Sequence, residues 1–239
     1  MTTTTTSTDP LPDDFGHAFI RGVHESVGGA AEALGDLDRR AGDGDFGTNV
    51  RTALKLAAQN IETEQPATYR QWVTTMYMGW LGVGGTSGPL FGMFFRDLAK
   101  AADGAEGESA RVRAADGAGS PSLAQFAEAL AAGQATVQKY GEADVGDKTM
   151  VDALDPAVSA LRSAVEAGSS PSEALAAAEK AAVDAARATA ETAAKRGRAS
   201  YVGEVAKGVI DPGAAAIALV IGAARAAADG GDVDTAWIS

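Results

Sequence analysis

The chain has 239 residues, a formal net charge of −12 at pH 7 and no cysteine. Its length allows one large domain or two small ones, and 46% hydrophobic residues can fill a sizeable core. The lack of cysteine excludes disulfides, thiolate zinc sites and cysteine nucleophiles. The acidic charge argues against a nucleic acid or an anionic membrane as the main partner.

The N-terminal residues predict neither a targeting signal nor a folded element. Positions 1–12 combine a threonine tract with two prolines and offer almost nothing to bury, so we expect a disordered tail. The tail lacks the basic start and apolar core of a secretory signal. The longest strongly apolar run, Ala214–Ala224, is too short to span a bilayer. We therefore expect a cytoplasmic protein with no membrane span and one domain over residues 13–239.

Apolar residues recur at helical spacing along most of the chain and predict eight helices. We expect them over 14–34, from about 47, from 66 to 81, from 87, from 121, over 151–165, from 171 to about 195, and from 212. Residues 103–119 are rich in glycine, serine and charge, and they predict a long exposed loop. Abundant alanine and mostly short connections favour an all-α fold, an eight-helix antiparallel bundle or closed barrel.

Three aspartates lie close together in residues 37–49, LDRRAGDGDFGTN. Interspersed glycines permit tight turns, so one loop can direct Asp38, Asp43 and Asp45 towards one point. Oxygen ligands without histidine or cysteine suit Mg²⁺, which keeps sites for water and phosphate. A surface turn is the alternative, since Asp and Gly are common there. An EF-hand loop that starts at Asp38 is excluded, because its twelfth position requires glutamate and is occupied here by Asn49.

Three further irregular segments precede predicted helices. The sequence GGTSGP at 84–89 can bring backbone N–H groups to a phosphate at a helix start. The sequence GDKTM at 146–150 contains a polarizable Met150 that could face a flat base. Arg198, in GRASY at 197–201, is suited to binding phosphate. Each segment also has an ordinary structural explanation. Residues 84–89 could be a closely packed helix start, residues 146–150 a helix cap with Met150 in the core, and Arg198 a surface arginine.

Taken in order, these segments resemble the L subunit of bacterial dihydroxyacetone kinase, which also occurs as the C-terminal domain of single-chain dihydroxyacetone kinases. The matching sequences are LDRRAGDGDFGTN, GGTSGPLFG, GDKTMVDAL, GRASY and DPGA, and the resemblance covers the chain from about residue 15 to 235. The resemblance implies an eight-helix antiparallel barrel with the nucleotide in loops at one end.

The resemblance also implies roles for individual residues. Asp38, Asp43 and Asp45 would hold two Mg²⁺ ions that bridge the phosphates of ADP or ATP, and Arg198 would join them as a catalytic residue. The nucleotide would be surrounded by Phe46, Gly47, Thr48, Asn49, Thr86 and Ser87 at the phosphates and ribose, by Gly141, Thr149 and Met150 near the adenine, and by Arg198, Asp211, Pro212 and Gly213, which close the site.

The family implies partner chains as well. The ketose would be bound on a separate K subunit, and a phosphotransferase-system protein could recharge a resident ADP. A transcription regulator is a further family partner, which gives a regulatory function as the alternative, and a kinase for another substrate, such as a four-carbon ketose, is a third. A homodimer is also compatible with the resemblance.

Two positions depart from the family pattern. The family reads GDGDHG and GHQDPG, whereas this chain has Phe46 and Val209 in place of the two histidines. Neither side chain can hydrogen-bond a phosphate, so phosphate geometry and the sugar substrate are the properties most affected. The two histidines of the chain, His17 and His24, lie outside every motif.

Overall fold

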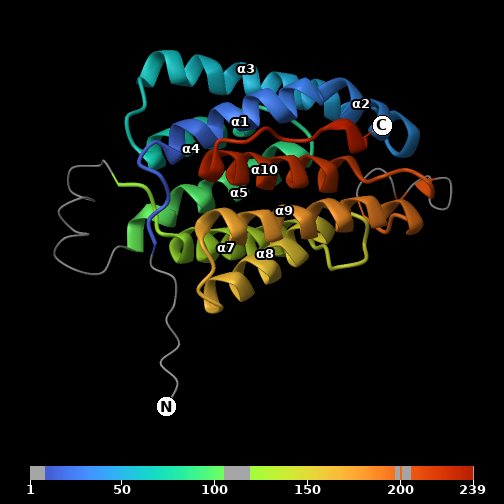
Figure 1. The fold of residues 1–239 in the computed structure, drawn as a ribbon. Coiled ribbons are helices and arrows are strands. Elements are labelled where there is room, and N and C mark those ends of the chain that lie inside the picture. Colours follow the sequence, from blue (N-terminus) through green and yellow to red (C-terminus); the bar gives the residue numbers. More distant parts are fainter. Residues whose placement is uncertain (1–8, 105–118, 197–199, 201–205, 239) are drawn as a thin grey trace.

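The computed structural model describes residues 9–104, 119–196, 200 and 206–238 (Figure 1). Within these ranges the chain forms nine α-helices and no extended strand, so the predicted all-α class is confirmed. The helices are α1 (Phe15–Gly29), α2 (Ala31–Ala41), α3 (Phe46–Glu64), α4 (Tyr69–Leu81), α5 (Ser87–Ala99), α7 (Leu123–Gly141), α8 (Met150–Glu166), α9 (Pro171–Ala188) and α10 (Pro212–Asp229). The described part of the chain also contains the 3₁₀ turns η1 (Lys100–Gly104), η2 (Thr189–Glu191) and η5 (Ala236–Ile238).

Some helix boundaries differ from the prediction. The expected first helix is divided at Ala30, and its second part, α2, continues to Ala41. The division lets α1 pack against α10 while α2 turns to pack mainly against α3. Helix α9 ends at Ala188 rather than near Lys195, and the chain continues into η2. Alanine-rich sequence carries no signal for either change, because alanine favours helix wherever it stands.

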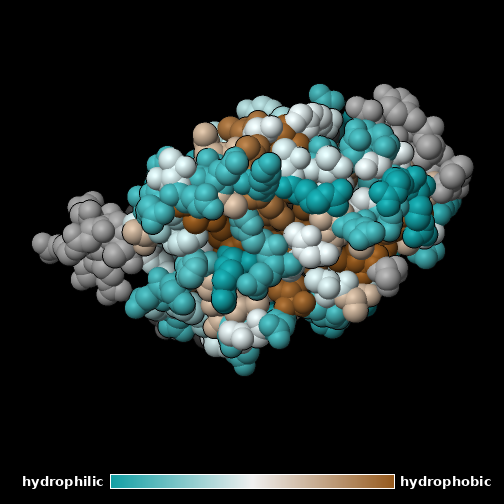
Figure 2. Space-filling model, turned by 90° about the horizontal axis from the view of Figure 1, so that it is seen from above, coloured by the Kyte–Doolittle hydropathy of each residue, from teal (hydrophilic) through white to brown (hydrophobic). Residues whose placement is uncertain are grey.

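The helices close into a ring around an apolar core. In Figure 1 and in the packing contacts, α1, α4, α5, α7, α8 and α10 follow one another as neighbours, and α10 packs again on α1. Helix α9 covers α8 and α10, while α2 and α3 lie on the opposite side. Aromatic side chains fill the centre, where Phe15 stacks on Phe19 and meets Phe126 edge to face. Hydrophilic side chains cover much of the face seen in Figure 2.

Helix α10 is the most apolar element. It is the one described helix long and apolar enough to cross a membrane, but 67% of that window is buried inside the protein. Its small side chains from Ala214 to Ala224 are all buried, which allows neighbouring helices to approach closely. The burial identifies α10 as the core helix of the bundle.

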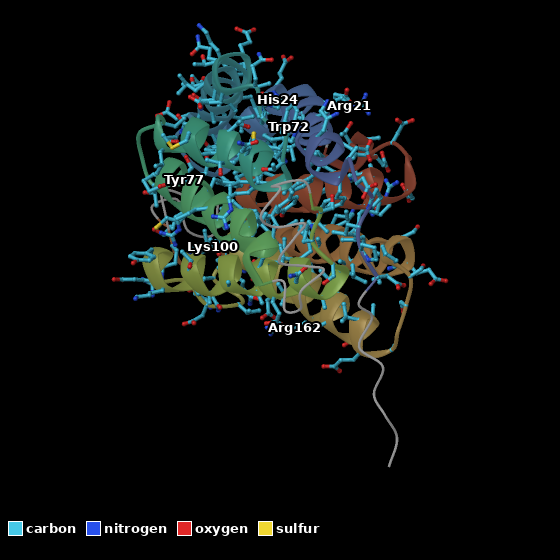
Figure 3. All side chains as sticks on the ribbon, turned by 90° about the vertical axis from the view of Figure 1, so that its left-hand side faces the viewer. Arg21, His24, Trp72, Tyr77, Lys100 and Arg162 are labelled. Carbon is cyan, nitrogen blue, oxygen red and sulfur yellow. The ribbon has the colours of Figure 1, made fainter. Side chains whose placement is uncertain are left out.

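Polar contacts also join neighbouring helices. The buried carboxylate of Asp97 on α5 accepts hydrogen bonds from Lys100 at 2.7 Å and from Thr136 on α7 at 2.6 Å. Arg162 on α8 pairs with Glu128 on α7 at 2.8 Å. Lys100 and Arg162 both lie on the side of the molecule that faces the viewer in Figure 3. These bonds link α5, α7 and α8 in sequence around the ring.

Residues 9–12 do not follow the expectation of a free tail. The backbone N–H of Leu11 donates to Pro121 at 3.0 Å, and that of Leu123 donates to Asp9 at 3.1 Å. The Leu11 side chain is 2% exposed and belongs to the core. The prediction of a tail without core residues is therefore wrong for Leu11, because one large apolar side chain suffices to anchor the segment. Residues 1–8 of that prediction lie outside the described part.

Candidate nucleotide site

A cavity of about 470 Å³ is lined by residues of the α2–α3, α4–α5, α7–α8 and α9–α10 junctions. These junctions lie at one end of the bundle, at the right of Figure 1. These four junctions contain the four segments that the sequence analysis singled out. The predicted residues that line the cavity are Asp38, Asp43, Asp45, Phe46, Asn49, Thr86, Ser87, Gly141, Thr149, Met150, Asp211, Pro212 and Gly213. The fold therefore brings residues more than 170 positions apart in the sequence to one site.

Asp38 and Asp43 form the centre of the acidic wall. Asp38 lies in the last turn of α2, and its Oδ2 accepts a hydrogen bond of 2.9 Å from the backbone N–H of Phe46. Burial raises the pKa of Asp38, and the nearby charge of Asp43 raises it further, against the lowering effect of the Phe46 N–H. The two carboxylates therefore lie close enough for their charges to interact.

The three aspartates do not form a ready three-ligand cluster. No group of three acidic or histidine side chains among the described residues is placed to hold a metal ion. Asp45 is exposed, and its backbone N–H donates to Asp43 Oδ1 at 3.3 Å. The donor set nevertheless fits Mg²⁺, which is usually bound by one or two carboxylates and completes its shell with water and phosphate oxygens.

Four helices begin at the cavity, namely α3, α5, α8 and α10. The first N–H groups of a helix lack intrahelical partners, and the helix dipole places partial positive charge there. Asn49 in the first turn of α3 donates to the Ser87 hydroxyl at the start of α5 over 3.3 Å, which links two of these helix ends. An anion such as phosphate is therefore stabilised here despite the acidic charge of the chain.

Part of the cavity lining is apolar. Leu90, Phe91 and Val137 form this part together with the predicted Met150 and Gly141. Leu90 had no predicted site role, since helical spacing does not distinguish a core position from a cavity wall. The combination of an acidic loop, helix N-termini and an apolar wall suits a ligand with both phosphates and a flat base.

Two predicted phosphate contacts lie elsewhere. Gly47 is absent from the cavity wall, because it packs against α2, where an added Cβ would overlap the carbonyl oxygen of Ala31. Thr48 is exposed and outside the wall, and its hydroxyl accepts a hydrogen bond of 3.4 Å from Arg51. Helical geometry separates them from the site, because adjacent residues on a helix point in different directions.

Phe46 lines the cavity but packs mainly into the core. Its side chain is 7% exposed, and its ring lies 5.8 Å from that of Phe91 and 6.4 Å from that of Trp80. Only its backbone N–H, bound to Asp38, belongs to the polar wall. Val209, at the other position where the family has histidine, is also buried, and its carbonyl oxygen accepts from Lys148.

Arg198 lies outside the described residues. Two other cationic side chains, Arg196 and Lys148, line the cavity and were not among the predicted site residues. Arg196 approaches Asp147 at 3.5 Å and Glu142 at 3.8 Å. Lys148 is 1% exposed. Both residues stand within or directly beside a quoted motif, so proximity to the motif was the available signal.

Asp211 lines the cavity and is the N-cap residue of α10. Its Oδ2 accepts a 2.7 Å hydrogen bond from the backbone N–H of Ala214, as aspartate at an N-cap position commonly does. Burial raises the pKa of Asp211 to about 7; the Ala214 N–H opposes this, and the charges of Asp152 and Asp38 add to it. The cap therefore titrates near neutral pH.

Comparison with known proteins gives consistent matches. The model of the DAK2 domain family matches residues 40–226. The ADP-binding subunit DhaL of PEP-dependent dihydroxyacetone kinase 1 from Listeria innocua is 32% identical over 209 residues, which cover 87% of this chain and 92% of the relative. The corresponding DhaL subunit from Escherichia coli is 33% identical over 188 residues, covering 78% and 83%.

Longer relatives match over one part only. Human triokinase/FMN cyclase is 35% identical over 195 residues, and the match covers 31% of that protein. The crystal structure of the dihydroxyacetone kinase from C. freundii in complex with AMP-PNP and Mg²⁺ aligns with a TM-score of 0.64 at 26% identity. The alignment covers 93% of this chain and 35% of that one.

Proposed function

The chain belongs to the DAK2 domain family, and from that premise we propose that it is the nucleotide-binding L subunit of a dihydroxyacetone kinase. The observation that carries the proposal is one cavity lined by paired aspartates, the N-termini of four helices and apolar side chains. Relatives that share this domain bind ADP or, in a solved structure, AMP-PNP with Mg²⁺.

Three groups of cavity residues bind the base, the phosphates and the metal ions, respectively. Leu90, Phe91 and Met150 hold the flat base by apolar contact. The N–H groups at the helix starts and the Ser87 hydroxyl orient the phosphates. Asp38 and Asp43, with Asp45 at the rim, would hold two Mg²⁺ ions, which neutralise phosphate charge when bound. Phosphoryl transfer requires such positioning and charge neutralisation and no protein nucleophile.

The acceptor would be dihydroxyacetone or a similar small ketose bound on a separate K subunit. The nucleotide would be a resident ADP recharged by a phosphotransferase-system protein, or an exchanging ATP. We propose a cytoplasmic location and one folded domain, which includes Leu11 because that residue belongs to the core.

Calorimetry with MgADP tests the proposal. The wild-type protein should bind MgADP, and EDTA should abolish binding, because the paired carboxylates would otherwise repel the phosphates. Asp43→Asn should weaken binding at least tenfold with unchanged helical circular dichroism. Asp184→Asn, which removes an exposed carboxylate on α9, is the matched control. Equal ADP affinity in EDTA would rule out the metal-bridged site.

A second function, engagement of a transcription regulator, is favoured by Phe46 and Val209, which remove two hydrogen-bonding side chains from the site. An assay of phosphoryl transfer to dihydroxyacetone with the K subunit separates the two functions. Transfer supports the kinase. Tight MgADP binding without transfer supports the regulatory relative.

A further inference from the structure

Lys148 is a buried cation surrounded by backbone oxygens. Its side chain is 1% exposed, although lysine is rarely buried without partners. Its Nζ donates to four carbonyl oxygens: Thr189 at 2.8 Å, Thr192 at 3.1 Å, Ala206 at 2.8 Å and Val209 at 2.7 Å. An ammonium has three protons, so four acceptors saturate it and leave none for a ligand.

These acceptors lie on both sides of the connection between α9 and α10. Thr189 and Thr192 follow directly on α9, while Ala206 and Val209 precede α10. The two sides also bond each other, because the N–H of Gly208 donates to Ala190 at 2.8 Å. Lys148 itself lies two residues before α8, so one side chain joins the start of α8 to both ends of the α9–α10 connection.

The neighbouring residue, Asp147, anchors the same connection from a second position. Its carbonyl oxygen accepts from the N–H of Lys195 at 3.0 Å, and its carboxylate faces Lys195 and Arg196 at 3.5 Å. Lys148 has a positive φ of 62°, a conformation that side-chain-bearing residues rarely adopt. The bonds on both residues compensate for that backbone cost.

A chain of hydrogen bonds leads from Lys148 to the start of α10. The carbonyl of Thr189 accepts from Lys148, and the Thr189 hydroxyl accepts a 2.8 Å bond from the N–H of Asp211. Asp211 in turn caps α10 through Ala214. Burial lowers the pKa of Lys148, and the charge of Asp211 opposes that shift, so the two groups lie close enough to interact.

We propose that Lys148 is a positioning residue, which uses its ammonium group to hold the start of α10 and the Thr189–Thr192 turn against α8 and thereby sets the shape of the nucleotide cavity. It acts through Thr189 and Asp211 rather than by touching the nucleotide. The proposal rests on the proposed function for its effect on ligand binding, but its structural part can be measured without ligand.

The test compares Lys148→Met with Lys180→Met. Methionine keeps the length of the side chain and removes its charge and donors, and Lys180 is an exposed lysine on α9 with 77% of its side chain accessible. At a temperature where circular dichroism shows each variant folded, Lys148→Met should raise the Kd for MgADP at least tenfold. Lys180→Met should bind as the wild type does.

Hydrogen exchange without nucleotide gives the second measurement. In Lys148→Met, the amides of Thr192, Gly208 and Asp211 should exchange at least tenfold faster, while those in α3 and α5 should keep their wild-type rates. This result holds whether or not the wild type binds MgADP. A wild type that fails to bind would therefore refute the proposed function alone.

A milder variant covers the case in which Lys148→Met does not fold. Thr189→Val keeps the shape of the side chain but removes the hydroxyl that accepts from Asp211. Like Lys148→Met, it should raise the Kd for MgADP and speed hydrogen exchange at the Asp211 amide. A folded Lys148→Met, or failing that Thr189→Val, with a Kd and exchange rates within twofold of wild type would overturn the proposal.

Discussion

Replacing Phe46 by histidine restores the family residue at a position where the structure has an aromatic contact. Phe46 is buried and lies beside Phe91 and Trp80, whereas an imidazole there would lose apolar burial and leave a polar nitrogen among aromatic rings. We therefore expect Phe46→His to act in opposite directions on the nucleotide-free and nucleotide-bound protein.

The magnitude follows from the contacts. Burial of a phenylalanine side chain is worth about 1.5–3 kcal/mol, and each aromatic pair adds about 0.5–1.5 kcal/mol, part of which an imidazole keeps. The nucleotide-free variant should lose about 2–4 kcal/mol of unfolding free energy. For a chain of this length, that loss lowers Tm by roughly 4–16 °C.

Bound phosphate should offset part of the stability that Phe46→His loses. A hydrogen bond to a charged group is worth about 1.5–3 kcal/mol, and it becomes available only if the imidazole turns from the aromatic cluster to the ligand. Saturating MgADP should therefore narrow the Tm difference between Phe46→His and wild type by at least half. Phe46→Leu is the control, because it loses the aromatic contacts and cannot form the bond.

Differential scanning calorimetry with and without MgADP measures both effects. If the nucleotide-free Tm of Phe46→His equals that of wild type, the ring does not contribute the packing described here. If MgADP widens the Tm difference instead, phenylalanine itself favours the bound state, and the position is a specific adaptation of this chain.

Three further outcomes are expected. Leu11→Ala should cost about 2–4 kcal/mol in urea unfolding, because it empties a core position, and a loss under 0.5 kcal/mol would mean that residues 9–12 do not pack. The folded pKa of Asp211, about 7, lies above its unfolded value, so the folded chain binds the proton more tightly and nucleotide-free stability should fall as pH rises from about 4 to 7. Asp211→Asn, which keeps the cap, should weaken this fall in urea titrations at pH 5 and 8; an identical pH dependence would exclude Asp211 as its source. Gly47→Ala should lower Tm and MgADP affinity together by forcing α2 from α3, while Gly29→Ala, whose Cβ meets nothing within 4 Å, should do neither.

The sequence was sufficient for the fold class and for most of the cavity wall. Apolar spacing predicted the helix over 151–165 that the structure has as α8 and the helix from 212 that it has as α10, because this signal is local. The break at Ala30 and the end of α9 were missed, since tertiary packing decides where an alanine-rich helix stops.

Long-range contacts decide where several of the predicted site residues lie in the structure. Gly47 was assigned to the phosphate, yet it permits the close approach of α2, which no local pattern reveals. Lys148 stood inside a recognised motif, but its four carbonyl partners come from residues 41 to 61 positions away. The direction of the Phe46 ring likewise depends on Trp80 and Phe91 in other helices.

The alternation of helix directions divides the connections of the molecule into two classes. Every junction that lines the cavity lies at one end, whereas the α3–α4 and α8–α9 connections lie at the other (Figure 1). Evolution can therefore lengthen or replace the second class without altering ligand geometry. For protein engineering, residues 65–68 and 167–170 are the natural places to insert a reporter or an affinity handle, because such an insertion leaves every cavity-lining residue in place.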